Sequence, residues 1–222
     1  MLIKTRGIVF RFTKYGETSI IVNIFTEAYG MQGYIVNGVR SHTSKSKIAL
    51  YQPLTLVELV AYHKDQADLT RIKEVRCLYQ YQHLPVDIRK STVAMFLNEI
   101  INKTIKEESH SEEVFEFLMT SFIALDQITA GVENFHIIFL IKLSRFLGFG
   151  AQSKNEWVGG RFATPETETL LEILVKAEYI DTVQIANAQR KELLELVLQF
   201  YSDHVESFGE LKSLPVLREV LS

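Results

Sequence analysis

The sequence predicts an α+β protein in which a five-stranded closed β-barrel precedes a domain built from helices. Apolar residues alternate with polar ones up to about residue 82, whereas after Pro85 they recur every three or four positions. Strands and amphipathic helices have these two periods, respectively. A length of 222 residues leaves room for two modest hydrophobic cores. We therefore expect a barrel domain over residues 1–82 and a helical domain over residues 83–222.

The strands are predicted from alternation, from β-branched residues and from the turn residues between them. Ile8, Phe10 and Phe12 are apolar residues at alternate positions, which indicates the first strand. The stretches that meet these criteria lie at residues 8–12, 19–25, 34–36, 54–62 and 69–81. Five short strands would leave exposed edges in an open sheet, so a closed Greek-key barrel is the expected arrangement.

The helices follow from apolar residues at i, i+3 and i+4 spacing. They are predicted at residues 93–105, 111–128, 134–147, 165–177 and 187–204, with a short last helix after Pro215. The third is apolar on nearly every side, so we expect it to be the buried central helix. Thr164 followed by Pro165 is typical of a helix N-cap and a first helical residue. Between Gly148 and Thr164 we expect a loop, which holds the single tryptophan.

Charge is distributed unevenly along the chain. Residues 1–90 contain 13 Lys and Arg against 7 Asp and Glu, a net charge of +6, whereas residues 91–222 contain 11 against 20, a net charge of −9. A basic half joined to an acidic half is typical of a protein in which one domain binds a polyanion. Chance asymmetry is the alternative interpretation.

Sequence features of export and membrane insertion are missing. The first ten residues carry Lys4 and Arg6 within their apolar stretch, unlike a signal peptide. The longest strongly apolar stretch, residues 135–149, is interrupted by two cations and is too short to span a bilayer. The single cysteine, Cys77, excludes an intramolecular disulfide and agrees with a reducing compartment. We therefore expect a cytoplasmic protein without a membrane segment.

Motifs of catalysis and metal binding are also missing. The six histidines show no HExxH pattern and no close cysteine, so a zinc hydrolase is not supported. Residues 30–33 and 148–150 contain paired glycines but lack the GK[ST] ending of a phosphate loop. There is no GxSxG elbow, and Cys77, inside a predicted strand, is most simply a small core residue. We expect no active site, no cofactor and no metal.

Short motifs stand in a particular order across the first 53 residues. They are Gly7-Ile8-Val9, Tyr15-Gly16-Glu17, Phe25-Thr26 with Gly30, Gly38-Val39-Arg40, Ser46-Lys47 and Gln52-Pro53. Together they resemble the N-terminal OB-fold of bacterial RecO recombination mediators. The helical part, with Phe146-Leu147-Gly148-Phe149 at the end of a long apolar helix, is similar to the same family. Many members continue with a cysteine cluster that can hold zinc, but residues 151–155 contain no cysteine, so no metal is carried over.

The resemblance implies a non-enzymatic protein of DNA repair that is associated with the nucleoid. It implies binding to single- and double-stranded DNA and annealing of complementary strands. It further implies association with the ring-forming partner RecR, contact with the acidic C-terminal tail of single-stranded-DNA-binding protein, and help in loading RecA at gaps.

The residues themselves indicate where DNA would bind. Affinity that is indifferent to sequence requires cations along a groove and flat side chains on which bases stack. The cations expected to bind DNA are Lys4, Arg6, Arg11, Lys14, Arg40, Lys45, Lys47, Arg71 and Lys73. Tyr15, Tyr34 and Tyr51 are aromatic residues near them, with core packing as the alternative role. The segment Ser41–Lys47, with small hydroxyl residues beside its cations, is the most specific piece.

In the helical half, Lys142 and Arg145 lie one turn apart on an otherwise apolar helix. They could extend to the surface simply to end a core helix. The sharper hypothesis is that they border a hydrophobic groove, with Phe139 or Phe146 nearby, for an acidic tail that ends in phenylalanine.

Three rival functions stay open at the level of the sequence. The barrel could belong to an RNA-binding or translation-related factor, which would prefer RNA to single-stranded DNA. It could be a scaffold that binds only protein. A small hydrolase is the third alternative.

Overall fold

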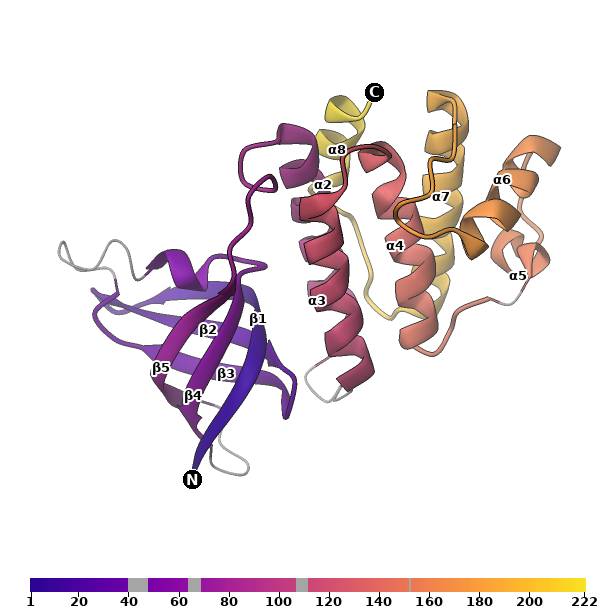
Figure 1. Ribbon diagram of the computed structural model, residues 1–222. Coiled ribbons are helices and arrows are strands. Elements are labelled where there is room, and N and C mark those ends of the chain that lie inside the picture. The colour runs from indigo at the N-terminus through magenta and orange to yellow at the C-terminus, as the bar shows by residue number, and fades with distance from the viewer. Residues whose placement is uncertain (40–47, 64–68, 107–111, 152) are drawn as a thin grey trace. The chain divides into compact units, whose positions relative to one another are not determined.

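The computed structural model describes residues 1–39, 48–63, 69–106, 112–151 and 153–222. The described part contains a five-stranded closed barrel followed by seven α-helices, which confirms the predicted fold class (Figure 1). The chain divides into two compact units. The first comprises residues 1–81 and 105–120, and the second comprises residues 82–104 and 121–222.

The barrel closes in the order β1-β2-β3-β5-β4, with β4 returning to β1 (Figure 1). Its strands are β1 (Leu2–Tyr15), β2 (Ser19–Thr26), β3 (Gly30–Val36), β4 (Leu56–Tyr62) and β5 (Thr70–Tyr79). All neighbouring strands are antiparallel except β3 and β5, which are parallel. The N-terminal half of β1 pairs with β4 and its C-terminal half pairs with β2, so this long strand belongs to both sides of the barrel. A short 3-10 helix, η2 (Ala49–Tyr51), precedes β4.

A β-bulge in β1 changes which side chains face the barrel interior. The register with β2 passes from Val9 directly to Arg11 and skips Phe10. Val9 and Phe12 pack in the barrel core, whereas Phe10 packs against Phe25 with ring centroids 5.5 Å apart. Phe10 and Phe12 therefore point to opposite sides although they are two residues apart, because the inserted residue reverses the alternation after Val9. The same bulge turns Arg11 to the exposed side.

Helix α3 (Glu112–Gln127) contributes its first half to the barrel unit. Phe115 is fully buried there and lies against Phe25, with ring centroids 6.4 Å apart. The outer side of the bulged strand is therefore covered by apolar side chains of this helix, and Phe10 is fully buried although it points away from the barrel core.

Gly7 lies in the barrel wall where no side chain fits. A Cβ at this position would lie 2.5 Å from Cγ2 of Ile24 and 3.1 Å from Cδ2 of Leu59. We expect Gly7→Ala to lower the free energy of unfolding by about 1–3 kcal/mol, because a packed core resists one additional carbon. Urea denaturation measures the loss, with Thr13→Ala at an exposed position of the same strand as the control. Equal midpoints for wild type and Gly7→Ala would contradict the tight packing.

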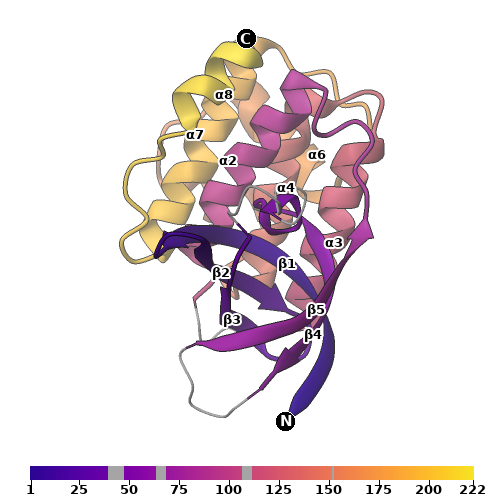
Figure 2. The same cartoon turned by 90° about the vertical axis from the view of Figure 1, so that its left-hand side faces the viewer.

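The second unit is a helical bundle around α4 (Val132–Phe146). Eleven of the fifteen residues of α4 are buried, which confirms it as the central helix. The other helices are α2 (Ile88–Thr104), α5 (Lys154–Val158), α6 (Pro165–Lys176), α7 (Asn187–His204) and α8 (Leu214–Val220), together with the end of α3. Helix α4 packs against α2, α6 and α7, and α8 lies along α2 (Figure 2). None of the helices in the described part of the chain is long and apolar enough to cross a membrane.

Capping residues fix the ends of α5 and α6. The hydroxyl of Thr164 accepts a hydrogen bond from the backbone N–H of Thr167, and Pro165 opens α6, as predicted. Helix α5 was not predicted, because five residues are too few for a helical period to show. It begins at Ser153, whose side chain accepts from the backbone N–H of Glu156. The helix buries Trp157 against Phe200, with ring centroids 4.2 Å apart.

Candidate nucleic-acid interface

The outward surface of four barrel strands brings two of the predicted cations to one side. Thr13 of β1 pairs with Ile21 of β2, Ile21 pairs with Ile35 of β3, and Ile35 pairs with Arg71 of β5. Directly paired residues point to the same side of a sheet, and Ile20 and Tyr34, next to this row, point into the barrel core. The row therefore faces outward. We call it the barrel face, and define it by Arg11, Thr13, Tyr15, Ile21, Asn23, Ile35 and Arg71.

The barrel face is positively charged. Arg11 lies beside the row, paired with Asn23, and Arg71 closes the row at the other edge. Both side chains are exposed, and neither forms an ion pair with a carboxylate of the described residues. Strands β2 and β3, which lie between them, contain no acidic residue. With strands about 4.8 Å apart, the two arginines frame a surface roughly 14 Å wide.

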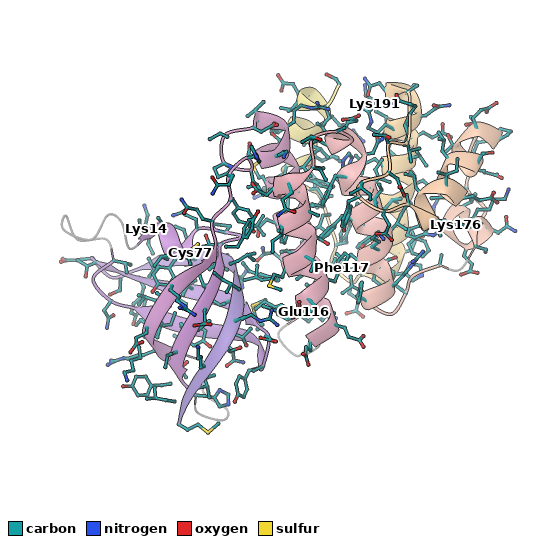
Figure 3. All side chains as sticks on the ribbon, viewed as in Figure 1. Lys14, Cys77, Glu116, Phe117, Lys176 and Lys191 are labelled. Atoms are coloured by element: carbon teal, nitrogen blue, oxygen red, sulfur yellow. The ribbon has the colours of Figure 1, made fainter. Side chains whose placement is uncertain are left out.

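Tyr15 belongs to the barrel face, and Lys14 and Lys73 flank it. Lys14 pairs with Ile20 and leaves β1 on the other side of the strand, at its exposed end. Lys14 and Tyr15 end β1 and are exposed, Tyr15 by 51% (Figure 3). Lys73 is one of the two residues of β5 that the β4–β5 register skips, and its Nζ lies 4.0 Å from the carboxylate of Glu74. An exposed ring beside cations is the arrangement on which a base stacks while its phosphate is neutralised.

Two of the three tyrosines expected near DNA are core residues. Tyr34 is 1% exposed and Tyr51 is 3% exposed, and both belong to the hydrophobic core of the barrel. Burial raises the pKa of Tyr51 to about 12 and that of Tyr34 further still. Neither ring can stack on a base in this fold, so their expected role in binding is wrong and core packing is correct.

Lys4 is placed on a different side of the barrel, in a cluster of opposite charges. Its Nζ lies 3.1 Å from Glu58, which also binds Arg76 at 2.7 Å. The hydrogen bonds from Arg76 and Lys4 lower the pKa of the Glu58 carboxyl. Sequence reasoning missed Arg76, although it follows Arg71 and Lys73 in the same strand. The shared carboxylate pairs with both cations and offsets one of their two positive charges.

Arg6 is held between two carboxylates. Its Nε donates to Glu27 at 2.8 Å, and its Nη2 pairs with both Glu27 and Glu116. The guanidinium also lies 5.3 Å from the ring centroid of Phe115. The hydrogen bond from Arg6 lowers the pKa of Glu27. Arg6 thus fastens the first half of α3 to β1, and it is not part of the barrel face.

Three further predicted DNA-binding residues lie outside the described residues. They are Arg40, Lys45 and Lys47.

The four residues proposed for the tail groove occupy different environments. Phe139 is fully buried and packs against Phe122, so it cannot form a wall of an open groove. Lys142 binds Glu178 at 2.9 Å, and Nη2 of Arg145 donates to a backbone carbonyl on α6 at 2.7 Å. Phe146 is 40% exposed. Arg145 and Phe146, side by side at the end of α4, are the two members of the set that remain accessible.

Other reactive groups in the described part of the chain are few. Cys77 is exposed on β5 (Figure 3), which corrects its expected place in the core. No group of three or more His, Cys, Asp or Glu side chains among the described residues is arranged to hold a metal ion.

A closed five-stranded barrel with a cationic outer face, joined to a helical bundle, defines a protein of the nucleic-acid-binding OB-fold class. Residues 1–81 match the family model described as Recombination protein O N terminal, and residues 85–161 match Recombination protein O C terminal. The chain belongs to the RecO family of DNA repair proteins. It is 35% identical over 239 residues to the DNA repair protein RecO of Flavobacterium psychrophilum, with all of both chains covered. It is 33% identical over 241 residues to the corresponding protein of Phocaeicola vulgatus, again over all of both chains.

Proposed function

We propose that the protein is a DNA-binding and strand-annealing recombination mediator, with no catalytic activity of its own. Nucleic acid binds to residues 1–82 and protein partners bind to residues 83–222. In the cell the protein acts on chromosomal DNA together with RecR and single-stranded-DNA-binding protein, and helps to load RecA at gaps. Membership of the RecO family supports the role in repair, and the barrel face supports the binding of DNA.

The barrel face is the single observation that carries the proposal. Its cations contact phosphates and Tyr15 stacks on a base, whereas no constellation that reads base edges is needed. Binding is therefore indifferent to sequence. Annealing follows in the same way, because neutralised phosphates let two complementary strands approach each other.

Binding to a fluorescent oligothymidylate across a salt series tests the proposal. If Arg11, Lys14, Arg71 and Lys73 each neutralise one phosphate, the logarithm of affinity falls with a slope of about −3 against the logarithm of salt concentration. An RNA competitor of equal length should displace the DNA no better than unlabelled DNA does. Absent or salt-insensitive binding would instead favour a scaffold that binds only protein, and a strong preference for RNA would favour an RNA-binding factor.

The segment before η2 supplies a second set of cations in the sequence. We expect Lys45→Glu with Lys47→Glu to weaken DNA binding markedly at moderate salt, since each change replaces an attraction to phosphate with a repulsion. The same titration measures the effect, with Lys106→Glu and Lys176→Glu as a double control of equal charge change. Unchanged affinity of the Lys45/Lys47 variant would remove this segment from the DNA site.

The end of α4 is the proposed contact for an acidic protein tail. Arg145 would neutralise a carboxylate of the tail while Phe146 packs against its phenylalanine. We expect Arg145→Ala to reduce the affinity for a labelled peptide with an acidic, phenylalanine-terminated sequence by about tenfold. Lys176→Ala removes a charge from a neighbouring helix and is the control. Equal affinities for the Arg145 variant and the wild type would place the tail elsewhere.

A further inference from the structure

A small cavity lies between α4, α7 and α8 in the helical unit. Its volume is about 20 Å³, enough for one water-sized atom. The lining residues are His136, Asn187, Arg190, Lys191, Leu194, Leu217, Arg218 and Leu221. Three of these eight side chains are cations and none is an acid, although this half of the chain is acidic as a whole.

Two buried polar groups at this cavity have no hydrogen-bond partner among the described residues. One is the imidazole of His136, which is 1% exposed and unpartnered at both Nδ1 and Nε2. The other is Nε of Arg218. Burial, with a smaller contribution from Arg190, lowers the pKa of His136 to about 3, so the ring is neutral and carries one N–H donor. Buried donors without partners are rare in proteins and indicate a position for a bound acceptor.

Positive charge is concentrated around these donors. Arg190 and Lys191 lie near the start of α7, whose first turn contains no acidic residue. Cations near a helix N-terminus oppose the helix dipole, whereas an anion there is stabilised. Among the described residues, Arg190 donates to neutral oxygens, those of Asn134, Ile185 and Leu221, at 3.0–3.2 Å. Its charge is therefore not neutralised by direct contact with a carboxylate.

We propose that this cavity is a binding site for a phosphate group. One phosphate oxygen enters the cavity and accepts hydrogen bonds from His136 and from Nε of Arg218. Arg190 and Lys191 neutralise the remaining charge at the rim. Three cations and a helix N-terminus match a phosphate dianion better than a single carboxylate. Arg218 pairs with Glu195 at 3.0 Å, whereas Arg190 and Lys191 form no ion pair with a carboxylate in the part of the chain that the structure describes.

The number of cations favours a terminal phosphate. A recess that admits one atom can take an oxygen of any phosphate, but a monoester or inorganic phosphate carries up to two negative charges, whereas a phosphodiester carries one. Two ligands carry such a terminal phosphate group: free phosphate and the 5′ end of a nucleic-acid strand. The site lies wholly in the helical unit, so its existence does not depend on DNA binding at the barrel face.

Titration of the full-length protein with inorganic phosphate at constant ionic strength tests the site. The imidazole of His136, followed by NMR of histidine-labelled protein, should shift with phosphate, whereas the exposed ring of His83 should not. Acetate should produce no comparable shift. Arg218→Gln and Lys191→Gln should each weaken phosphate binding about tenfold. Lys176→Gln removes one exposed charge from α6 and should leave binding unchanged (Figure 3).

A second experiment distinguishes free phosphate from the 5′-phosphate of a strand. Oligonucleotides of equal sequence with a 5′-phosphate or a 5′-hydroxyl are compared for binding to the wild type and to Lys191→Gln. A preference for the 5′-phosphate that Lys191→Gln abolishes would support a strand end as the ligand. A shift with inorganic phosphate alone would support free phosphate. If His136 does not respond to phosphate, or responds equally to acetate, the phosphate site is overturned and the cavity holds water or a carboxylate.

Discussion

Neutralising Arg11 and Arg71 together, as Arg11→Gln with Arg71→Gln, is expected to weaken binding to single-stranded DNA about tenfold or more at moderate salt. The two side chains are exposed on the outward side of the barrel, at either edge of strands that contain no acid. Each contact with a single strand contributes about 0.7 to the salt slope. The slope should therefore become shallower by about 1.4, and this change is the measurement that identifies lost phosphate contacts.

The barrel supplies a matched control for this variant. Lys4→Gln with Arg76→Gln removes the same charge from the same domain, but at a cluster where both cations already bind Glu58. That pair should leave the salt slope unchanged, because both cations are already paired with Glu58. If both double variants lower the slope equally, binding responds to net charge alone and the barrel face has no special role.

Much of the fold could be predicted because period and turn chemistry are local properties. The Thr164-Pro165 pair marks the start of α6, and the apolar circumference of residues 134–147 marks the central helix. The bulge at Phe10 could not be predicted, since nothing in the alternation shows that the partner strand skips this residue. Helix α5 could not be predicted for a related reason. Its five residues show no helical period, and it is fixed by the Ser153 cap and the burial of Trp157.

The cations of the candidate site were less predictable, because the sequence does not show which of them pair with a carboxylate in the folded protein. Arg6 and Arg11 are five residues apart in one strand, yet the first is bound to Glu27 and Glu116 while the second is exposed. Only the strand register and the position of α3 separate them. The exposure of Tyr15 and the burial of Tyr34 likewise depend on which side of the barrel each residue faces.

Asp126 is the residue whose loss should destabilise the helical unit most. It lies at the end of α3, is 1% exposed, and receives three consecutive backbone N–H groups. Its carboxylate accepts from Gln82 at 3.1 Å, from His83 at 2.8 Å and from Leu84 at 2.7 Å. These three residues form the segment through which the chain enters the helical unit. The Asp126 carboxylate thus accepts the backbone hydrogen bonds of residues 82–84 that a helix or strand would otherwise accept.

Asp126→Ala is expected to lower the free energy of unfolding by about 3–5 kcal/mol, because it removes a buried charged acceptor and leaves three partly buried backbone N–H groups without it. Asp126→Asn keeps the shape and one acceptor oxygen, so its loss should be smaller. Asp87→Ala is the control, since Asp87 also accepts backbone N–H groups, from Arg89 at 2.8 Å and Lys90 at 3.3 Å. Its side chain is partly exposed at the start of α2, where a lost cap costs about 1 kcal/mol.

Urea denaturation followed by circular dichroism of the helices distinguishes these variants. A loss for Asp126→Ala no larger than for Asp87→Ala would mean that water satisfies residues 82–84 when the carboxylate is gone, and that this segment is held by side-chain packing. A loss several times larger would show that one buried charge fixes the path of the chain between its strands and its helices. In that case Asp126 acts on the stability of the helical unit and not on DNA binding. Variants at this position should lower the free energy of unfolding while the salt slope of DNA binding stays the same.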